Sequence, residues 1–320
     1  MLQSYIDAFD NNHSFPIPGP SPEQPILRFE ERHLQRSGLI NWNNTCCHLS
    51  LILAFHRMNL LRYLDPNLIA VGRNVLDWPA LILTKMLRAL PSPRPFSVQN
   101  FLTVWNANGR NPRLVANDDL TITDAIISQL PLTGHNNVPA LTKFQVSFAC
   151  PYCGQREESC EQWNERQWSA VPTLHLQPGS PPTRPETLLN GILQHGQQIR
   201  ITCPNLYCQL PVDATWKVVK GSYTILYINR DDGNGGIVRT RLRPSTLTTD
   251  QGLDILGELV SVIARSGERR NRGHFVSYHQ VGSHWFFSDD DHTFRRSPQH
   301  PFHRPQGRET VDLLCYYNNV

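Results

Sequence analysis

Cys46 and Cys47 stand at the start of an apolar run, where a thiol could act as a nucleophile. Residues 45–63 are apolar nearly all round, which predicts a helix buried in the middle of a domain. The polar residues just before Cys46 are suitable N-caps, so Cys46 would lie in the first turn. The partial positive charge there stabilises a thiolate, and a backbone N–H together with the Asn41 amide could hold an oxyanion. Free cysteines are also common as small buried residues, and this segment alone leaves that alternative open.

Two strand-like runs near the C-terminus, residues 273–280 and 284–288, are separated by a short turn that contains a glycine. Antiparallel pairing around that turn would place His274 opposite Asp289, to within one register step. A carboxylate beside a histidine fixes its tautomer and stabilises the imidazolium. Asp289 fits the register best, and Asp290 could instead polarise a water or the oxyanion region. The alternative is an ordinary edge hairpin with a solvated acidic turn.

Two cysteine pairs lie between these regions. Cys150 and Cys153 form a C-x-x-C knuckle with a glycine directly after it, and Cys203 and Cys208 form a second pair at a wider spacing. Four thiolates make a closed tetrahedral zinc site, which is structural because no position is left for water. Incidental thiols that bind no metal are one alternative, and a ligand set that includes Cys160 or His175 is another.

The elements that must position these groups change in character along the chain. Helical patterns follow the first helix over residues 78–90, 98–105 and 121–130. After Pro139 the pattern becomes one of short β-type runs broken by turn residues, over residues 143–149, 199–202, 216–219, 223–228, 237–242 and 259–264. The sequence therefore predicts an α+β fold, with helices first and an antiparallel sheet after them. Cys315 lies in an apolar run and is predicted to be part of the core.

Composition excludes several classes of protein. The chain has 320 residues, of which 39% are hydrophobic and 18% charged, as in a globular protein. The net charge of +3 requires neither a nucleic-acid nor a membrane partner, and no apolar run is long enough to span a bilayer. Eight cysteines without a secretory signal favour a reducing compartment, so we expect an intracellular protein of the cytoplasm, the nucleus or both.

Taken in this order, the motifs resemble those of the ubiquitin-specific proteases. That family's cysteine box runs Gly-Leu-x-Asn-x-Gly-Asn-Thr-Cys-Tyr, and residues 38–46 follow it closely. Its histidine box runs Gly-His-Tyr/Phe-x-x-Tyr, then Trp, then Asp-Asp, and residues 273–290 match that order. Residues 258–267 look like the strand that precedes the family's histidine, and residues 223–230 like the strand that follows its zinc pairs. The resemblance covers about residues 37–320.

The resemblance implies a papain-like cysteine peptidase fold shaped like a right hand. The expected parts are a proline-rich arm over residues 1–36, a helical thumb over 37–142, zinc-tipped fingers over 143–222 and an antiparallel palm over 223–320. The implied activity is that of a deubiquitinase, a thiol-dependent isopeptidase that cuts the bond between the C-terminal glycine of ubiquitin, or of a related modifier, and a lysine. Cys46 would be the nucleophile, His274 the base, Asp289 its carboxylate and Asn41 an oxyanion donor, with Asp290 in a secondary role.

Three positions depart from the family pattern, because Asn43 replaces a Gly, Cys47 a Tyr and Leu53 a Gln. They leave open whether the modifier is ubiquitin, SUMO or NEDD8. A family fold that binds a modifier without cutting it is a second alternative. A nucleic-acid-binding zinc element is a third, but it needs a basic face near the metal, and the surroundings are acidic: Glu157, Glu158, Glu161 and Asp213.

Overall fold

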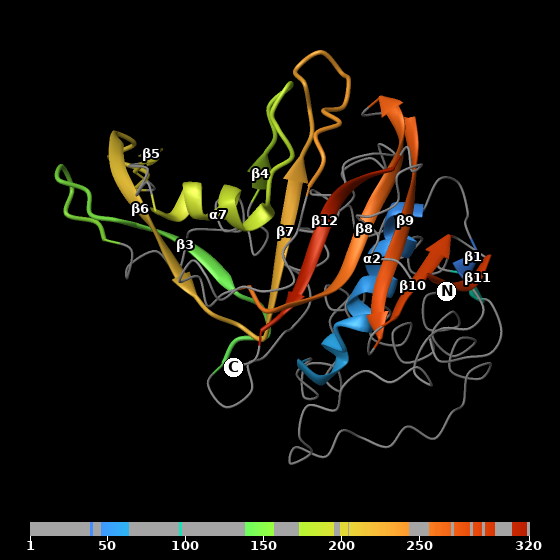
Figure 1. Ribbon diagram of the computed structural model, residues 1–320. Helices are drawn as coiled ribbons and strands as arrows, with labels where there is room; N and C mark the ends of the chain where they lie inside the picture. The colour runs from blue at the N-terminus through green and yellow to red at the C-terminus, as the bar shows by residue number, and fades with distance from the viewer. Residues whose placement is uncertain are drawn as a thin grey trace, which may run out of the picture. The chain divides into compact units, whose positions relative to one another are not determined.

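The computed structural model describes part of the chain (Figure 1). The described residues are 39–40, 46–63, 96–97, 138–156, 173–194, 199–203, 205–242, 256–269, 272–281, 284–289, 292–297 and 309–318. The proline-rich arm and the helices predicted over residues 78–90, 98–105 and 121–130 lie outside them. The chain divides into two compact units, one made of Met1–Thr133 with Val260–Glu309 and the other of Gly134–Leu259 with Thr310–Val320.

The first unit contains helix α2 (Cys46–Arg57), the buried helix that the sequence predicts. Every residue from Cys46 to Phe55 is buried, because the apolar side chains cover all sides of the helix. The prediction carried the helix to Tyr63, but it stops earlier. Asn59 takes a left-handed conformation with φ 52°, which ends an α-helix, and a separate 3₁₀ turn, η2 (Leu60–Tyr63), follows.

Four antiparallel strands complete the described part of the first unit, together with a short parallel pair. The four lie in the order β11, β10, β9, β8, and their bounds are β8 (Glu258–Arg269), β9 (Arg272–Val281), β10 (His284–Asp289) and β11 (His292–Ser297). The first two residues of β8 are counted with the second unit. The parallel pair is β1 (Leu39–Ile40) with β2 (Phe96–Ser97). The hairpin predicted over residues 273–288 is therefore present as β9 and β10.

The register of this hairpin differs from the prediction. A turn centred between Val281 and Gly282 would place Ser288 opposite Phe275, whereas Ser288 lies opposite Ser277. The turn is therefore centred one residue later than predicted, and β10 is shifted by two residues along β9. Since side chains alternate between faces with a period of two, this shift keeps every predicted pair of side chains on the same face.

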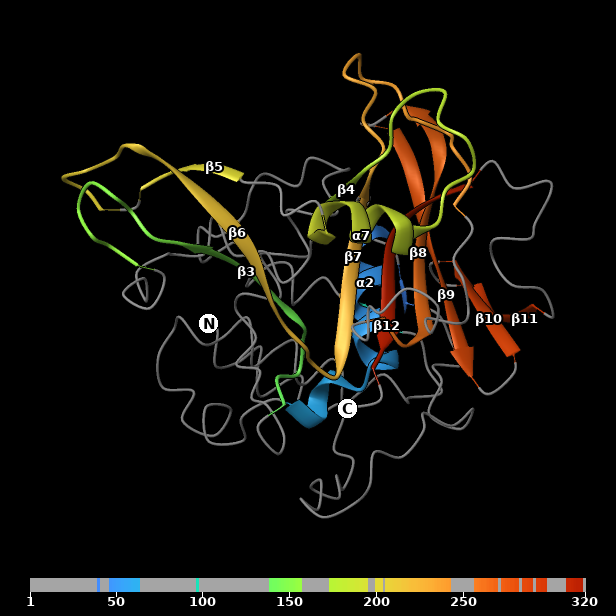
Figure 2. The ribbon, with the colours of Figure 1, turned by 60° about the vertical axis from the view of Figure 1, so that its left-hand side comes forward.

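The second unit has a long antiparallel sheet of three strands, drawn in green and yellow in Figure 2. The strands are β3 (Lys143–Phe148), β5 (Ile199–Thr202) and β6 (Pro211–Val219), in the order β3, β6, β5. Strand β6 starts five residues earlier than predicted. Its first residue is Pro211, a position where the missing N–H is tolerated. The turns beyond β3 and β5 carry the two cysteine pairs.

Three further strands and a helix complete the described part of the second unit. Strand β7 (Tyr223–Asn229) pairs antiparallel with β12 (Glu309–Tyr317) and parallel with β4 (Thr173–His175), and α7 (Pro185–Gln194) packs against β4. The α+β class is confirmed, although the parallel β4 makes the sheet mixed rather than wholly antiparallel. Cys315 is fully buried in β12, as predicted, and burial raises the pKa of its thiol.

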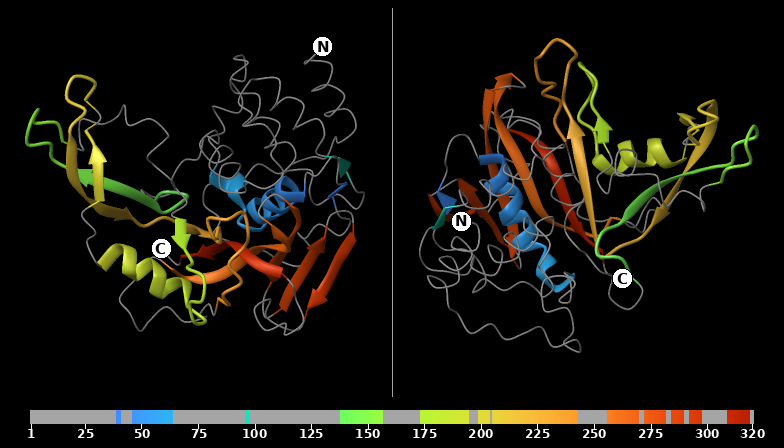
Figure 3. Two further views of the ribbon diagram at one scale, coloured as in Figure 1. Left: turned by 90° about the horizontal axis from the view of Figure 1, so that it is seen from above. Right: turned by 180° about the vertical axis from the view of Figure 1, so that it is seen from behind.

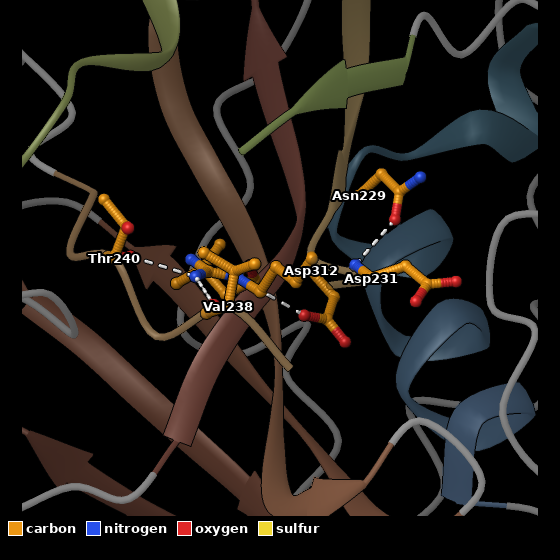
Figure 4. Close-up of polar contacts among 7 residues, drawn as sticks. Asn229, Asp231, Val238, Thr240 and Asp312 are labelled. Atoms are coloured by element: carbon orange, nitrogen blue, oxygen red, sulfur yellow. Dashed lines mark hydrogen bonds and ion pairs between the residues drawn. The ribbon is translucent and has the colours of Figure 1, made fainter. Parts of the chain in front are cut away.

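The prediction of a strand over residues 237–242 is wrong, because only one isolated β-bridge forms at each end of this segment. The buried guanidinium of Arg230 uses the carbonyls that a strand would need: it donates to Val238 O at 2.9 Å, to Thr240 O at 2.9 Å and to Val311 O at 2.7 Å. Asp312, also buried, faces it at 3.6 Å (Figure 4). This arginine therefore holds the segment after β7 as a fixed loop.

No helix among the residues that the structure describes is both long enough and apolar enough to cross a lipid bilayer.

Candidate active site and metal centre

His274 and Asp289 meet at the open end of the β9–β10 hairpin. His274 Nε2 lies 2.5 Å from Asp289 Oδ1, the short distance of a charge-assisted hydrogen bond. The side chains are 37% and 36% exposed, so the pair borders solvent. The predicted contact between these two residues is therefore present.

The contact forms although the two residues are not directly opposite each other. The regular β9–β10 pairs stop at Ser277 and Ser288, and the register of β10 against β11 shifts between Phe287 and Asp289. With the pairing continued by one residue, Asp289 would face Val276, and His274 would be its diagonal neighbour on the same face. Diagonal neighbours are within reach of long side chains, and an irregularity of this kind re-aims a side chain.

Cys46 is the first residue of α2 and is buried. Its position at the helix N-terminus is the one that the sequence predicts for a nucleophile, since the first N–H groups of a helix have no partner within it. Asn41 and Asp290, the other two candidate residues, lie outside the described part of the chain. Cys47 follows within the same first turn and is also buried.

Helix α2 packs against β9 in the first unit (Figure 3). Near the end of the helix, Arg57 Nε donates to Gln280 O of β9 at 2.5 Å. From that contact back to Cys46 the helix covers about 16 Å, at about 1.5 Å per residue. From Gln280 back to His274 the strand covers about 20 Å, at about 3.4 Å per residue. The two elements run in the same direction, so these similar lengths bring the Cys46 end of α2 toward the His274 end of β9.

Two further histidines of this unit are buried and were not singled out from the sequence. Burial lowers the pKa of His48 to about 4. Burial, together with the nearby charges of Arg57 and His56, lowers the pKa of His279 to about 3. Both imidazoles are therefore neutral at pH 7. A signal for His279 was available, because its odd spacing from His274 on one strand places the two rings on opposite faces.

The four predicted zinc ligands converge at the tip of the three-stranded sheet. The sulfur atoms of Cys150, Cys153, Cys203 and Cys208 all lie within 4.8 Å of one another. Cys150 Sγ is 3.7 Å from Cys208 Sγ, and Cys153 Sγ is 3.6 Å from Cys203 Sγ. A tetrahedral zinc with Zn–S bonds of about 2.3 Å separates its sulfurs by about 3.8 Å, so this group of thiols fits zinc.

The local backbone explains how the knuckles form. In the first, Gly154 has φ 73° and its N–H donates to Cys150 O at 3.0 Å, which turns the chain back after Cys153. In the second, Cys208 N and Gln209 N both donate to Asn205 O, and Gln209 adopts a positive φ of 46° in place of the usual glycine. Both knuckles thus reverse the chain within a few residues and direct their sulfurs toward each other.

The ionisation of these thiols also fits a cation. Burial raises the pKa of Cys150, but N–H groups of Cys153 and Tyr152 donate to its sulfur and bring the pKa down to about 7. Burial, with the neighbouring thiols, raises the pKa of Cys203 to about 12. One thiolate thus opposes the ionisation of the others, and a divalent cation would remove that cost.

Of the two alternative zinc ligands, the structure describes His175 but not Cys160. His175 lies on β4, exposed, with its Nδ1 3.2 Å from Asn229 Nδ2, and it does not belong to the group of four sulfurs. Cys160 lies outside the described residues.

A comparison with known proteins shows that this chain is similar in fold to a solved structure. No protein-family model matches the chain, and no curated protein matches it. Among solved structures, it is similar to the SAGA DUB module Ubp8/Sgf11/Sus1/Sgf73 bound to monoubiquitin, at 16% sequence identity and a TM-score of 0.56. The match covers 98% of this chain and 74% of that one. At this level of identity the likeness is one of fold alone.

Proposed function

We propose that this chain is a thiol-dependent isopeptidase that hydrolyses the bond between the C-terminal glycine of ubiquitin, or of a ubiquitin-like modifier, and a lysine. The observation that carries the proposal is the hydrogen bond between His274 and Asp289, on a hairpin packed against the helix that begins at Cys46. The fold likeness to a ubiquitin-bound DUB module supports the substrate class.

The proposed reaction uses few groups. The Cys46 thiolate attacks the isopeptide carbonyl, while its own backbone N–H and the Asn41 amide hold the oxyanion. His274, oriented by Asp289, protonates the departing lysine amine as the thioester forms. It then takes a proton from a water molecule that attacks the thioester and frees the modifier. Asp290 is proposed to act on the water or the oxyanion.

The fingers are proposed to bind the body of the modifier. The four large apolar side chains that stand exposed among the described residues lie in the two knuckles or within two residues of them: Tyr152, Leu206, Tyr207 and Leu210. Exposed apolar side chains grouped in this way are typical of a protein-binding surface. Zinc held by the four cysteines would serve as a structural cofactor that fixes these knuckles, with no part in the chemistry.

A panel of fluorogenic ubiquitin, SUMO and NEDD8 substrates tests the proposed activity. We expect turnover of at least one of them, abolished in Cys46→Ser and retained in Cys47→Ser, which removes the neighbouring buried thiol instead. Tight binding of a modifier without turnover would favour a non-catalytic binding module. Turnover of SUMO alone would assign the chain to that modifier.

The zinc assignment has its own test. One zinc per chain is expected by mass spectrometry of the purified protein, and Cys150→Ser or Cys203→Ser should lose it, while Cys315→Ser keeps it. Zinc content unchanged in both ligand variants would contradict the assignment.

A further inference from the structure

A buried polar cluster lies on β8 and β9, on the face of the sheet opposite to His274. His279 is 1% exposed, and Ser261 and Ser277 are fully buried. His279 Nδ1 lies 3.0 Å from Ser261 Oγ, and its Nε2 lies 3.0 Å from Ser277 Oγ. These three residues form what we call the serine–histidine cluster. Nothing in the proposed reaction uses it.

The hydrogen atoms of the cluster can be assigned by counting. The hydroxyl of Ser261 has one hydrogen, and it donates that hydrogen to the carbonyl of Tyr278 at 3.2 Å. Ser261 Oγ must then accept from His279, so the imidazole carries its hydrogen on Nδ1. The unprotonated Nε2 accepts the hydroxyl hydrogen of Ser277. Each hydrogen bond therefore fixes the direction of the next, and the ring has one tautomer.

The cluster lies where the register of three strands is last defined. Ser261 faces His279, which faces Phe286, and Ile263 faces Ser277, which faces Ser288. Toward His274 the pairing of all three strands together ends. The β9–β10 pairs stop at Ser277, and the β8–β9 register shifts just after the pair of Ser266 with His274. From Ser277 to His274, β9 stays paired with β8 but not with β10, and at the end of this run Ser266 Oγ donates to His274 O at 3.4 Å. The cluster thus lies at the row where the pairing of β9 with β10 ends.

At this position a buried hydrogen bond between two strands opposes a shift of one strand along the other. A buried polar group that loses its partner is costly, and this cost adds to that of breaking the backbone pairing when a strand shifts. A slip of β9 along β8 would separate His279 from Ser261, whereas Ser277 lies on the same strand as His279 and would move with it. The same strand also anchors the helix, since Arg57 Nε donates to Gln280 O, directly after His279.

We propose that His279 is a positioning residue for the isopeptidase: locked as the Nδ1–H tautomer between Ser261 of β8 and Ser277 of its own strand, it fixes β9 against β8 and so sets the position from which His274 reaches Asp289. The proposal rests on the proposed function for its kinetic consequence. Its structural part, the tautomer and the geometry of His274, stands without it.

The structural part is tested by NMR of ¹⁵N-histidine-labelled protein. At pH 7 the His279 ring should show one neutral tautomer, protonated at Nδ1, and the His274–Asp289 hydrogen bond should give a proton resonance far downfield. In His279→Phe, which keeps a buried ring without the polar atoms, that His274 resonance should broaden or move upfield. A His279 ring protonated at Nε2, or a His274 resonance unchanged in the variant, would overturn the proposal.

The kinetic part is tested on the best substrate of the fluorogenic panel. His279→Phe and Ser277→Ala should each lower kcat about tenfold and leave KM within twofold, because modifier binding does not involve the cluster. Ser288→Ala is the matched control, since this buried hydroxyl has no hydrogen-bond partner among the described residues, and it should keep kcat. A drop in kcat in Ser288→Ala equal to that in Ser277→Ala, or a change confined to KM, would contradict the proposal. Absence of turnover in the wild type, with the NMR results as expected, would refute the proposed function and leave the register role intact.

Discussion

Strand β9 carries two histidines five positions apart, and the sheet gives them opposite surroundings. His274 borders solvent, and its partner is a carboxylate at 2.5 Å. His279 is buried, and its partners are two hydroxyls at 3.0 Å. A carboxylate stabilises the charged imidazolium, whereas neutral hydroxyls in a buried site do not. One residue type on one strand is thus placed beside a carboxylate at one position and kept neutral by burial at the other.

The largest effect is expected from His274→Ala. Loss of the general base should lower kcat/KM by about 10³-fold, within the usual range for such a group. The melting temperature should hardly change, because the side chain is partly exposed. Fluorogenic turnover and thermal unfolding measure the two quantities. His175→Ala, on an exposed histidine of β4, serves as the control. If His274→Ala keeps activity, the contrast between the two histidines has no catalytic meaning.

Asp289→Asn should come next, with a loss of about 10²-fold in kcat, because the amide no longer stabilises the imidazolium. Asp290→Asn should lose less, in line with a secondary role. Parallel kinetics of the two variants at one substrate concentration series give the ratio. A larger loss in Asp290→Asn would transfer the role of the orienting carboxylate to that residue.

Lowering the pH should decrease the stability of the folded protein through the buried histidine, His279. Unfolded histidine has a pKa of about 6.5, while that of folded His279 is about 3. The unfolded state therefore binds more protons below pH 6.5, and stability falls as the pH drops from there toward 3. For this one group we expect a loss of about 2 kcal/mol between pH 7 and pH 5.

Urea unfolding at pH 7 and pH 5 measures that loss. His48, with a folded pKa of about 4, adds to it in the wild type. His279→Phe should therefore lose less stability over this interval than the wild type does. An equal loss in both proteins would mean that His279 is already charged in the folded state.

The smallest expected effects are on the unfolding free energy, when either of the two buried serines that face each other on β9 and β10 is replaced. Ser277→Ala leaves His279 Nε2 without its donor and should cost about 1–2 kcal/mol of unfolding free energy. Ser288→Ala removes a hydroxyl that has no hydrogen-bond partner among the described residues, so its effect should stay below about 0.5 kcal/mol. Urea unfolding of both variants at pH 7 makes the comparison. Equal losses would show that volume, and not hydrogen bonding, matters at this site.

The sequence predicted those features that depend on neighbours close along the chain. The buried helix that begins at Cys46 and the pairing of β9 with β10 follow from local periodicity and a short turn, and both are present. The four cysteines were predicted as a group because knuckle spacing is itself a local signal, and their sulfurs converge.

Two of the features that were missed depend on contacts distant in sequence, and a third depends on the exact centre of a turn. Residues 237–242 have the composition of a strand, but Arg230 takes the carbonyls of Val238 and Thr240. The exact hairpin register depended on where the turn is centred, which composition does not fix. His279 gains its role from Ser261 on another strand, and a single sequence gives no sign of that pairing. For residues 237–242 and for His279, a tertiary contact decided between structures that the local pattern allows.

The proposed role of Cys46 is tested by covalent labelling with modifiers that carry a C-terminal electrophile, with the labelled residue identified by mass spectrometry. We expect one adduct, on Cys46, formed with ubiquitin or a related modifier, slowed strongly in Asp289→Asn and His274→Ala and unaffected in Cys47→Ser. Labelling of Cys47 or of a knuckle cysteine in place of Cys46, or no labelling by any modifier of the panel, would contradict it.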